Sequence, residues 1–204
     1  MSETNFCAAT TRNTEKTELR RRLRKARAAM SEAERAAATR TINVRLKRLI
    51  RRNSRIGIYW PIGKELRLDG FVQAALQRGA KLYLPYIEPN ARRLWFTPYF
   101  ADQRQRPERR KGRSKLYIPQ FAGEKIRVHR LNTLIVPVVG MDRRGFRLGQ
   151  AGGFYDATLS AMKHRLQAKT IGAGFACQLV DALPAEAHDI PLDGFVSEHD
   201  NLRF

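Results

Sequence analysis

Residues 133–159, TLIVPVVGMDRRGFRLGQAGGFYDATL, join a short apolar run to a glycine-rich segment that leads into a helix. The apolar run over residues 134–139 is rich in branched side chains, which is typical of a strand buried on both faces of a parallel sheet. We expect the strand to end at Gly140, and the five glycines from there to Gly153 allow the backbone to approach a ligand closely. Unpaired amides at the start of the following helix attract anions, and nearby positive charge comes from Arg143, Arg144 and Arg147.

The spacing of these glycines leaves two interpretations open. A phosphate-binding loop and a turn without a ligand are about equally compatible with it, because neither the Walker pattern GxxxxGK[ST] nor GxGxxG is present. The order of strand, loop and helix predicts an α/β fold in both cases.

Length and composition indicate one domain, which we expect over residues 14–204, with residues 1–13 disordered. No apolar run is long enough for a membrane span, and the first residues lack the apolar core of a secretory signal. Cys7 and Cys177 are far apart and form no metal-binding or disulfide pattern. These features favour a cytoplasmic protein that does not interact with membranes, and we expect a monomer.

The formal net charge of +20 bears on the partners of the protein. Such a charge favours attraction to nucleic acid or to small ligands with several negative charges. No RNP, KH, zinc-finger or homeodomain pattern is present, so the sequence does not support specific nucleic-acid recognition. Non-specific adhesion to RNA or DNA at low salt is expected.

The remaining elements alternate between helical and strand patterns. We expect a first helix from Thr14 to Met30, and a second one that begins at the capping box of Ser31 and Glu34. Glu65 is expected to be exposed just past the end of a strand, where open α/β sheets bind ligands. The other expected elements are strands over residues 55–61, 81–87, 91–100, 169–176 and 194–196, a helix over 68–76, and a basic loop or exposed helix over 101–114.

Four motifs carry a resemblance to a known family. The run GFRLGQAGGFYD over residues 145–156 closely resembles the GxRLGxGxGxYD signature of the 5-formyltetrahydrofolate cyclo-ligase family. KTELR over residues 16–20 is similar to the family's KxxLR helix, IYWPIGKEL over 58–66 resembles its folate-binding segment, and PAEAHDIPLD over 184–193 resembles its closing pattern. The chain departs from the signature at Ala151 and Gly152, where glycine and often lysine are usual.

The resemblance implies a single α/β domain with a Rossmann-like, mixed or parallel sheet flanked by helices, preceded by an N-terminal helical pair. It also implies an ATP- and Mg²⁺-dependent enzyme that converts 5-formyltetrahydrofolate into 5,10-methenyltetrahydrofolate, ADP and phosphate. The formyl oxygen would be phosphorylated, and N10 would then close the ring. Polyglutamylated folate is an additional expected substrate, since the basic loops would attract its tail.

The same resemblance assigns roles to individual residues. Arg147 would be catalytic, and Mg²⁺ would be held by Asp156 and Asp189. Folate would be bound by Trp60, Glu65, Gln150, Gly152 and Phe154. ATP would be bound by Lys16, Arg20, Arg147, Leu148, Gly149, Gln150, Ala151, Gly152, Gly153, Phe154 and Tyr155. Two alternatives remain, namely a degenerate member that binds folate or nucleotide without turnover and a basic RNA-associated protein.

Overall fold

The structure is a computed structural model that describes residues 3–102, 105–108, 118–165, 167–186 and 189–204. A mixed seven-stranded sheet forms its centre, in the order β10-β9-β7-β4-β1-β2-β3. The strands β1, β2, β4, β7 and β9 run parallel, while β3 and β10 are antiparallel strands at the two edges. This arrangement confirms the expected α/β fold. The strands are β1 (Arg55–Gly57), β2 (Lys81–Tyr86), β3 (Trp95–Tyr99), β4 (Thr133–Pro137), β7 (Lys169–Ala173), β9 (Gly194–Val196) and β10 (Asn201–Arg203).

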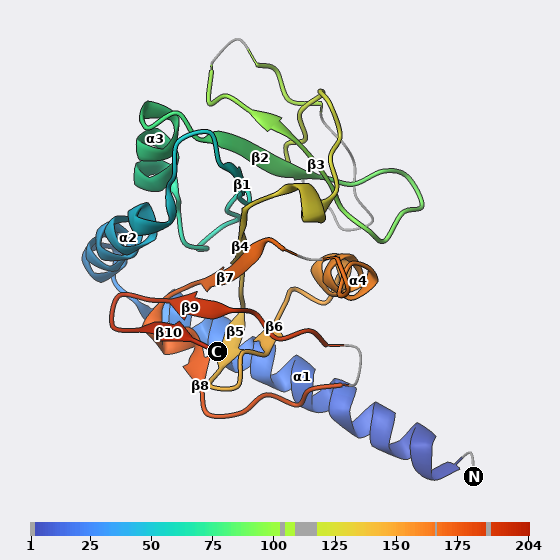
Figure 1. Ribbon diagram of the computed structural model, residues 1–204. Helices are drawn as coiled ribbons and strands as arrows, with labels where there is room; N and C mark the ends of the chain where they lie inside the picture. Colours follow the sequence, from blue (N-terminus) through green and yellow to red (C-terminus); the bar gives the residue numbers. More distant parts are fainter. Residues whose placement is uncertain (1–2, 103–104, 109–117, 166, 187–188) are drawn as a thin grey trace.

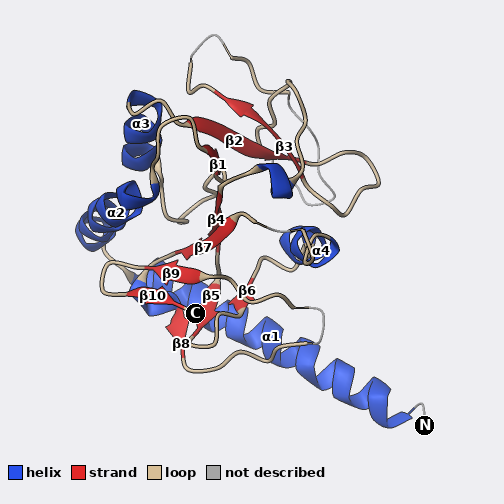
Figure 2. Ribbon diagram, in the orientation of Figure 1, coloured by secondary structure: helices blue, strands red, loops and turns tan. Residues whose placement is uncertain are grey.

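Helices cover both faces of this sheet (Figures 1 and 2). One face packs against α2 (Glu32–Leu46) and α3 (Asp69–Gln77), and the other packs against α4 (Phe154–Ala161). Successive side chains of β4 point to opposite faces of the sheet, so this strand contributes to the core on each face. Ile135 packs on the side of α2 and α3, whereas Leu134 and Val136 pack on the side of α4. The prediction that this apolar run is buried on both faces is therefore confirmed.

The first two helices form the expected helical pair, but the first one starts earlier than predicted. Helix α1 spans Glu3–Ala29, so residues 3–13 are drawn as helix where the sequence favoured disorder. No proline or glycine interrupts this span, so its sequence contains no strong helix breaker. The predicted capping box at the start of α2 is confirmed, since the Ser31 side chain accepts from the Glu34 amide at 3.2 Å.

Several other boundaries also differ from the expectation. The strand expected over residues 55–61 ends at Gly57, because only the Ile58 amide still bonds to β2 and Pro61 has no amide to donate. The segment expected to be a loop from Gly140 onward begins as a hairpin of β5 (Gly140–Asp142) and β6 (Arg147–Leu148). These two strands form a small second sheet with β8 (Leu179–Val180).

The short helical turns are η1 (Lys47–Leu49), η2 (Val128–Arg130) and η3 (Ala176–Gln178). His188 and much of the basic segment over residues 101–114 lie outside the described residues. No helix in the described part of the chain has the length and apolar character needed to cross a membrane.

Candidate functional site

The predicted site residues come from segments that follow the carboxyl ends of neighbouring parallel strands. Residues 58–68 follow β1, the β5–β6 hairpin and the glycine-rich segment follow β4, and residues 174–186 with β8 follow β7. Ligands of open α/β sheets bind at this edge. Helix α1 passes across the small sheet and adds a fourth segment (Figure 1).

A close helix-to-strand contact fixes the position of α1. Leu23 lies against Gly140 so tightly that a Cβ at the glycine would meet the Leu23 Cδ1 atom at 2.4 Å. Leu23 also packs with Val139 and Leu148, and all three side chains are almost fully buried. The side chain of Leu148, predicted to bind ATP, therefore belongs to the packing beneath α1.

This packing presents one basic face of α1 to the site. Lys16, Arg20, Arg24 and Arg27 are spaced by four, four and three residues, so they share that face and are called the basic stripe. Lys16 Nζ lies 2.7 Å from Glu186 Oε1 and 3.4 Å from Asp189 Oδ2.

The next two members of the stripe contact the glycine-rich segment. Arg20 Nε donates to the Gly149 carbonyl at 2.9 Å, and Arg24 Nη2 donates to Gln150 Oε1 at 2.5 Å. Burial and the nearby Arg24 lower the pKa of Arg20, while Asp156 acts in the opposite direction. The structure therefore places Arg20 next to the signature motif and Lys16 next to the closing motif.

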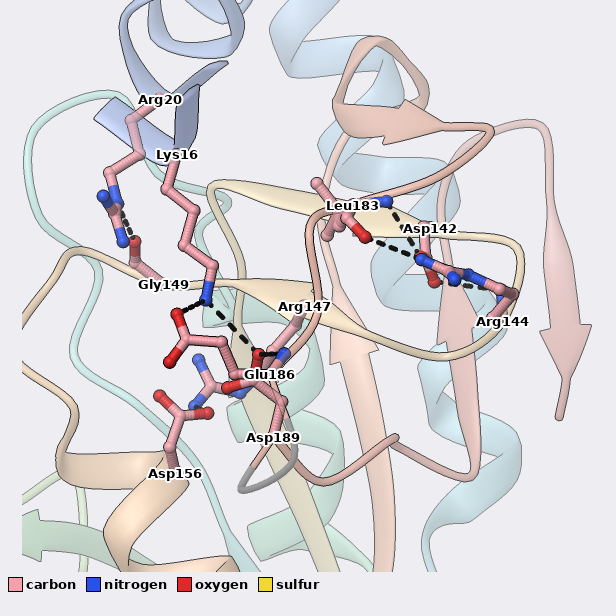
Figure 3. Close-up of polar contacts among 10 residues, drawn as sticks. All are labelled: Lys16, Arg20, Asp142, Arg144, Arg147, Gly149, Asp156, Leu183, Glu186 and Asp189. Carbon is pink, nitrogen blue, oxygen red and sulfur yellow. Dashed lines mark hydrogen bonds and ion pairs between the residues drawn. The ribbon is translucent and has the colours of Figure 1, made fainter. Parts of the chain in front are cut away.

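Arg147 and Asp156 form an ion pair at the centre of the site (Figure 3). Arg147 Nη2 lies 2.6 Å from Asp156 Oδ1, and the Arg147 side chain is only 3% exposed. Gly149 provides room for the guanidinium, because a Cβ there would lie 2.8 Å from Arg147 Nη1. Two polar atoms next to the pair, Arg147 Nε and the Tyr155 hydroxyl, are buried without a hydrogen-bond partner in the described structure. Burial also raises the pKa of Tyr155, so its hydroxyl stays protonated.

The start of α4 leaves backbone donors beside this pair. Its N-cap residue is Gly153, which adopts a left-handed conformation (φ 65°) and has no side chain that could cap the helix. Asp156 lies in the first turn, where a negative charge interacts favourably with the helix dipole. The first amides of α4 can therefore bind an anion.

Glu65 differs from the sequence expectation because it is buried, with 7% of its surface exposed. Its Oε2 atom accepts from the Ile62 amide at 3.0 Å, and its Oε1 atom accepts from Gln150 Nε2 at 2.8 Å. The segment after β1 folds back in a tight turn, and the turn carries the carboxylate inward. A buried carboxylate with these partners is well placed to accept hydrogen bonds from an N–H edge of a ligand.

The two predicted aromatic residues lie in different clusters. Trp60 is 36% exposed and its ring lies 6.2 Å from that of Tyr99 and 6.2 Å from that of Phe121, measured between centroids. Phe154 packs with the core on the α4 side and touches Gly152, where an added Cβ would lie 3.0 Å from its ring. Both offer aromatic surface, but no direct contact joins them.

Ala151 occupies a backbone conformation that favours glycine. Its φ angle is 76°, in the left-handed region that costs a residue with a Cβ about 1–2 kcal/mol. The departure from the signature at this position therefore carries backbone strain.

We expect Ala151→Gly to raise the free energy of unfolding by roughly 0.5–1 kcal/mol, after the greater chain entropy of unfolded glycine offsets part of the relief. Chemical denaturation measures this change. The matched control is Ala157→Gly within α4, which should lower the stability by about 1 kcal/mol. A loss of stability at both positions would contradict the strain at Ala151.

A second group of charged residues lies apart from the site. Asp142 is fully buried and accepts hydrogen bonds from the amides of Phe146 and Leu183 and from the side chain of Arg144. Figure 3 shows this group separated from Lys16 and the ion pair. Arg143 pairs at 3.5 Å with the exposed Asp181. Arg144 therefore does not supply free charge to the glycine-rich segment as expected, because it holds the buried Asp142 and the Leu183 carbonyl. Arg143 is exposed, and its pair with Asp181 contributes little.

Asp156 and Asp189 are the candidate metal ligands, and their chemistry fits Mg²⁺. Carboxylate oxygens suit this ion, which usually takes its remaining ligands from water and substrate phosphates. Both side chains are part-exposed, at 28% and 17%, and each lies beside a cation, Arg147 and Lys16 respectively. No cluster of three or more metal-binding side chains occurs in the described ranges, so a metal here would depend on a ligand for part of its coordination.

Sequence reasoning missed two residues of the site, Arg24 and Glu186, and one residue that holds the neighbouring hairpin, Asp142. Arg24 could have been found from its spacing, since it follows Lys16 and Arg20 at intervals of four. Glu186, the nearer partner of Lys16, lies within the closing motif but has no pattern of its own. Asp142 looks like an ordinary turn residue in the sequence, and only its zero exposure identifies it as the anchor of the hairpin.

The fold and the site define an α/β protein with a candidate anion site lined by arginine and glycine, and comparison with known proteins identifies the family. Residues 12–198 match the 5-formyltetrahydrofolate cyclo-ligase family. The chain is 33% identical to the 5-formyltetrahydrofolate cyclo-ligase of Escherichia coli K12 over 144 residues, which cover 70% of this chain and 76% of that protein. It is 28% identical to the Haemophilus influenzae enzyme of the same name over 185 residues, which cover 88% of this chain and 96% of that protein.

A solved structure agrees with this assignment. The Aquifex aeolicus 5,10-methenyltetrahydrofolate synthetase matches with a TM-score of 0.71 and 25% identity, and the match covers 92% of each chain. The chain therefore belongs to the 5-formyltetrahydrofolate cyclo-ligase family, as its motifs predicted.

Proposed function

We propose that the protein converts 5-formyltetrahydrofolate and ATP into 5,10-methenyltetrahydrofolate, ADP and phosphate. The observation that carries this proposal is the convergence of the signature motif with Lys16, Arg20 and Asp189 from the two ends of the chain. Family membership supports the same reaction.

The cationic part of the site is suited to the triphosphate. Lys16, Arg20 and Arg147 supply positive charge, and the open start of α4 supplies backbone amides. Asp156 and Asp189 would hold Mg²⁺, which neutralises phosphate charge when bound. Lys16 and Arg147, which pair with these carboxylates in the free protein, would then be released to the phosphates.

The folate would lie toward Glu65. The buried carboxylate would accept hydrogen bonds from the N–H groups of the pterin, and Trp60 or Phe154 would cover its ring. Gln150 bonds to both Arg24 and Glu65, so it links the two halves of the site. The net charge of +20 would also attract the glutamate tail, including a polyglutamate.

The reaction needs no covalent bond to the protein. The formyl oxygen attacks the γ-phosphorus, the bond to ADP breaks, and the formyl group becomes an activated phosphate ester. N10 then attacks the formyl carbon, the C–O bond to phosphate breaks, and N10 loses its proton as the methenyl bridge forms. The residues contribute by positioning two substrates and by stabilising phosphoryl charge.

The direct test mixes the purified protein with 5-formyltetrahydrofolate and MgATP and follows the absorbance of the methenyl product. We expect product only when both substrates and Mg²⁺ are present, with one ADP per product. Binding of folate or ATP by calorimetry without any product would instead identify the degenerate, binding-only protein.

A separate observation favours weak binding of nucleic acid as a second activity. The strands β1, β2 and β7 begin with Arg55, Lys81 and Lys169, with Arg55 and Lys81 paired in register. The exposed cations Arg51 and Arg52 lie next to this amino edge of the sheet. None of these five cations has a carboxylate partner within the described ranges. We propose that this amino edge, opposite the substrate site, adheres to nucleic-acid phosphates without sequence preference.

With five phosphate contacts, we expect the affinity for a single-stranded RNA to fall by about 10²-fold between 50 and 200 mM salt. Charge reversal of Arg51, Arg52 and Lys81 to glutamate should weaken binding and flatten this salt dependence, as measured by fluorescence anisotropy. Reversal of Arg21, Arg22 and Lys25, which are exposed on α1, is the matched control. Equal losses in both variants would show that the total charge, and not the amino edge, determines adhesion.

A further inference from the structure

Arg27 is a buried cation for which the signature motif provides no role. It is the last member of the basic stripe, and only 8% of its surface is exposed. Its side chain makes no hydrogen bond or ion pair with any residue that the structure describes, in contrast to the other members of the stripe. Arg147 Nε is fully buried without a partner, whereas the guanidinium nitrogens of Arg27 keep a small exposed surface.

Three contacts place Arg27 beside Glu65. Arg24, one turn earlier on the same face, bonds to Gln150, and Gln150 in turn bonds to Glu65. On the other side, Lys64 Nζ donates to the Ala28 carbonyl at 3.0 Å, which ties the turn carrying Glu65 to the end of α1. Helix and turn are thus held together where Arg27 and Glu65 lie.

The electrostatics agree with this geometry. Burial lowers the pKa of Arg27, and the negative charge of Glu65 is the largest influence that opposes the shift. A guanidinium in such a place has lost water without gaining a hydrogen-bond acceptor, which is costly unless a ligand supplies one. Glu65 accepts hydrogen bonds from the Ile62 amide and from Gln150. It therefore interacts with Arg27 electrostatically, without a direct hydrogen bond.

We propose that Arg27 donates to the 4-oxo oxygen of the pterin while Glu65 accepts from the adjacent N3–H and 2-amino group. This inference rests on the proposed function. This edge of the pterin presents one acceptor, the 4-oxo oxygen, beside two donors, N3–H and the 2-amino group. A guanidinium next to a carboxylate presents the matching donor beside two acceptor oxygens. For the ring to enter, Gln150 Nε2 must leave Glu65 Oε1. In the free protein this amide occupies the acceptor that the pterin N–H groups would use.

The pair would make the site selective for 4-oxo pterins. A 4-amino group would place a donor against the donors of Arg27 and would leave the buried guanidinium without an acceptor. The 4-amino compound also lacks the N3–H from which Glu65 would accept, so Glu65 contributes to this preference on its own. The part that depends on Arg27 is the part that is lost when Arg27 is replaced.

The test compares the wild type with Arg27→Met and Arg27→Lys, using Arg22→Met on the exposed face of α1 as the matched control. Loss of a hydrogen bond from a charged donor should raise the KM for 5-formyltetrahydrofolate roughly 10- to 150-fold in Arg27→Met. The KM for ATP should change by less than about twofold, since Arg27 lies beside Glu65 and not beside Arg147. Arg27→Lys should recover part of the loss, and Arg22→Met should match the wild type.

A second measurement uses the 4-amino-4-deoxy analogue as a competitive inhibitor. The wild type should bind the analogue at least about tenfold more weakly than the 4-oxo compound, and this ratio should fall by about tenfold in Arg27→Met. An unchanged ratio in a folded Arg27→Met overturns the inference. Equal affinity of the wild type for both compounds overturns the inference even if the variants fail to fold. An unchanged KM for folate in a folded Arg27→Met variant also overturns the inference about Arg27. In that case normal turnover by the wild type would still support the proposed function. Absence of turnover in the wild type would instead refute the proposed function.

Discussion

Replacing Arg147 with methionine is expected to lower kcat by about 10³-fold or more, with little loss of folate binding. The Arg147 side chain is only 3% exposed, and it pairs with Asp156 in the first turn of α4, where the phosphates would bind. In such a water-poor place a positive charge stabilises a phosphoryl transition state far more strongly than it would at the surface. Steady-state kinetics with saturating folate and varied ATP measure the effect.

Arg143→Met provides the matched control, because Arg143 lies on the same hairpin with 61% of its side chain exposed. It should leave kcat within about twofold, as exposed ion pairs contribute little. Because Arg147 is paired with Asp156, the variant's thermal unfolding must also be recorded. A folded Arg147→Met with near-normal kcat would remove the residue from the catalytic role.

Replacing Asp156 with asparagine is expected to abolish Mg²⁺-dependent turnover, with kcat reduced by at least about 10²-fold. The substitution keeps the shape of the side chain but removes the charge that a Mg²⁺ ligand supplies. It also frees Arg147 from its ion pair at 2.6 Å, so binding of ATP without metal should be retained or strengthened. Titration of activity with Mg²⁺, and calorimetry of ATP with and without the metal, separate the two effects.

Asp181→Asn is the matched control for this change, since Asp181 is fully exposed and pairs with Arg143 outside the site. Its Mg²⁺ dependence should equal that of the wild type. Normal turnover of Asp156→Asn at saturating Mg²⁺ would exclude Asp156 from the metal-binding residues.

The sequence predicted the fold because local patterns and the final packing agree for most of the chain. The branched run before Gly140 is buried on both faces of the sheet, and the capping box starts α2 where Ser31 placed it. Disagreements arise where tertiary contacts decide. The turn after β1 carries Glu65 into the interior, and Gly140 begins a hairpin that packs closely against Leu23 of α1. The burial of Glu65 and the contact with Leu23 have no local signal in the sequence.

The candidate site was predicted through its signature motif more than through its charges. The motif identified Arg147 and Asp156, and the structure joins them in one ion pair. The density of positive charge alone wrongly predicted that Arg144 is available to a ligand, because Arg144 pairs with the buried Asp142. Burial of Glu65 and the lack of a partner for Arg27 depend on how α1 meets the turn after β1, which no spacing rule contains.

The central claim is that phosphorylation of the formyl oxygen drives ring closure, and oxygen labelling tests it most directly. The measurement uses 5-formyltetrahydrofolate with ¹⁸O in the formyl group, incubated with the protein and MgATP in unlabelled water, followed by mass spectrometry of the released phosphate. The account predicts one ¹⁸O atom per phosphate for each methenyl product formed. Product formation with unlabelled phosphate, or no product from the folded wild-type protein, would contradict it.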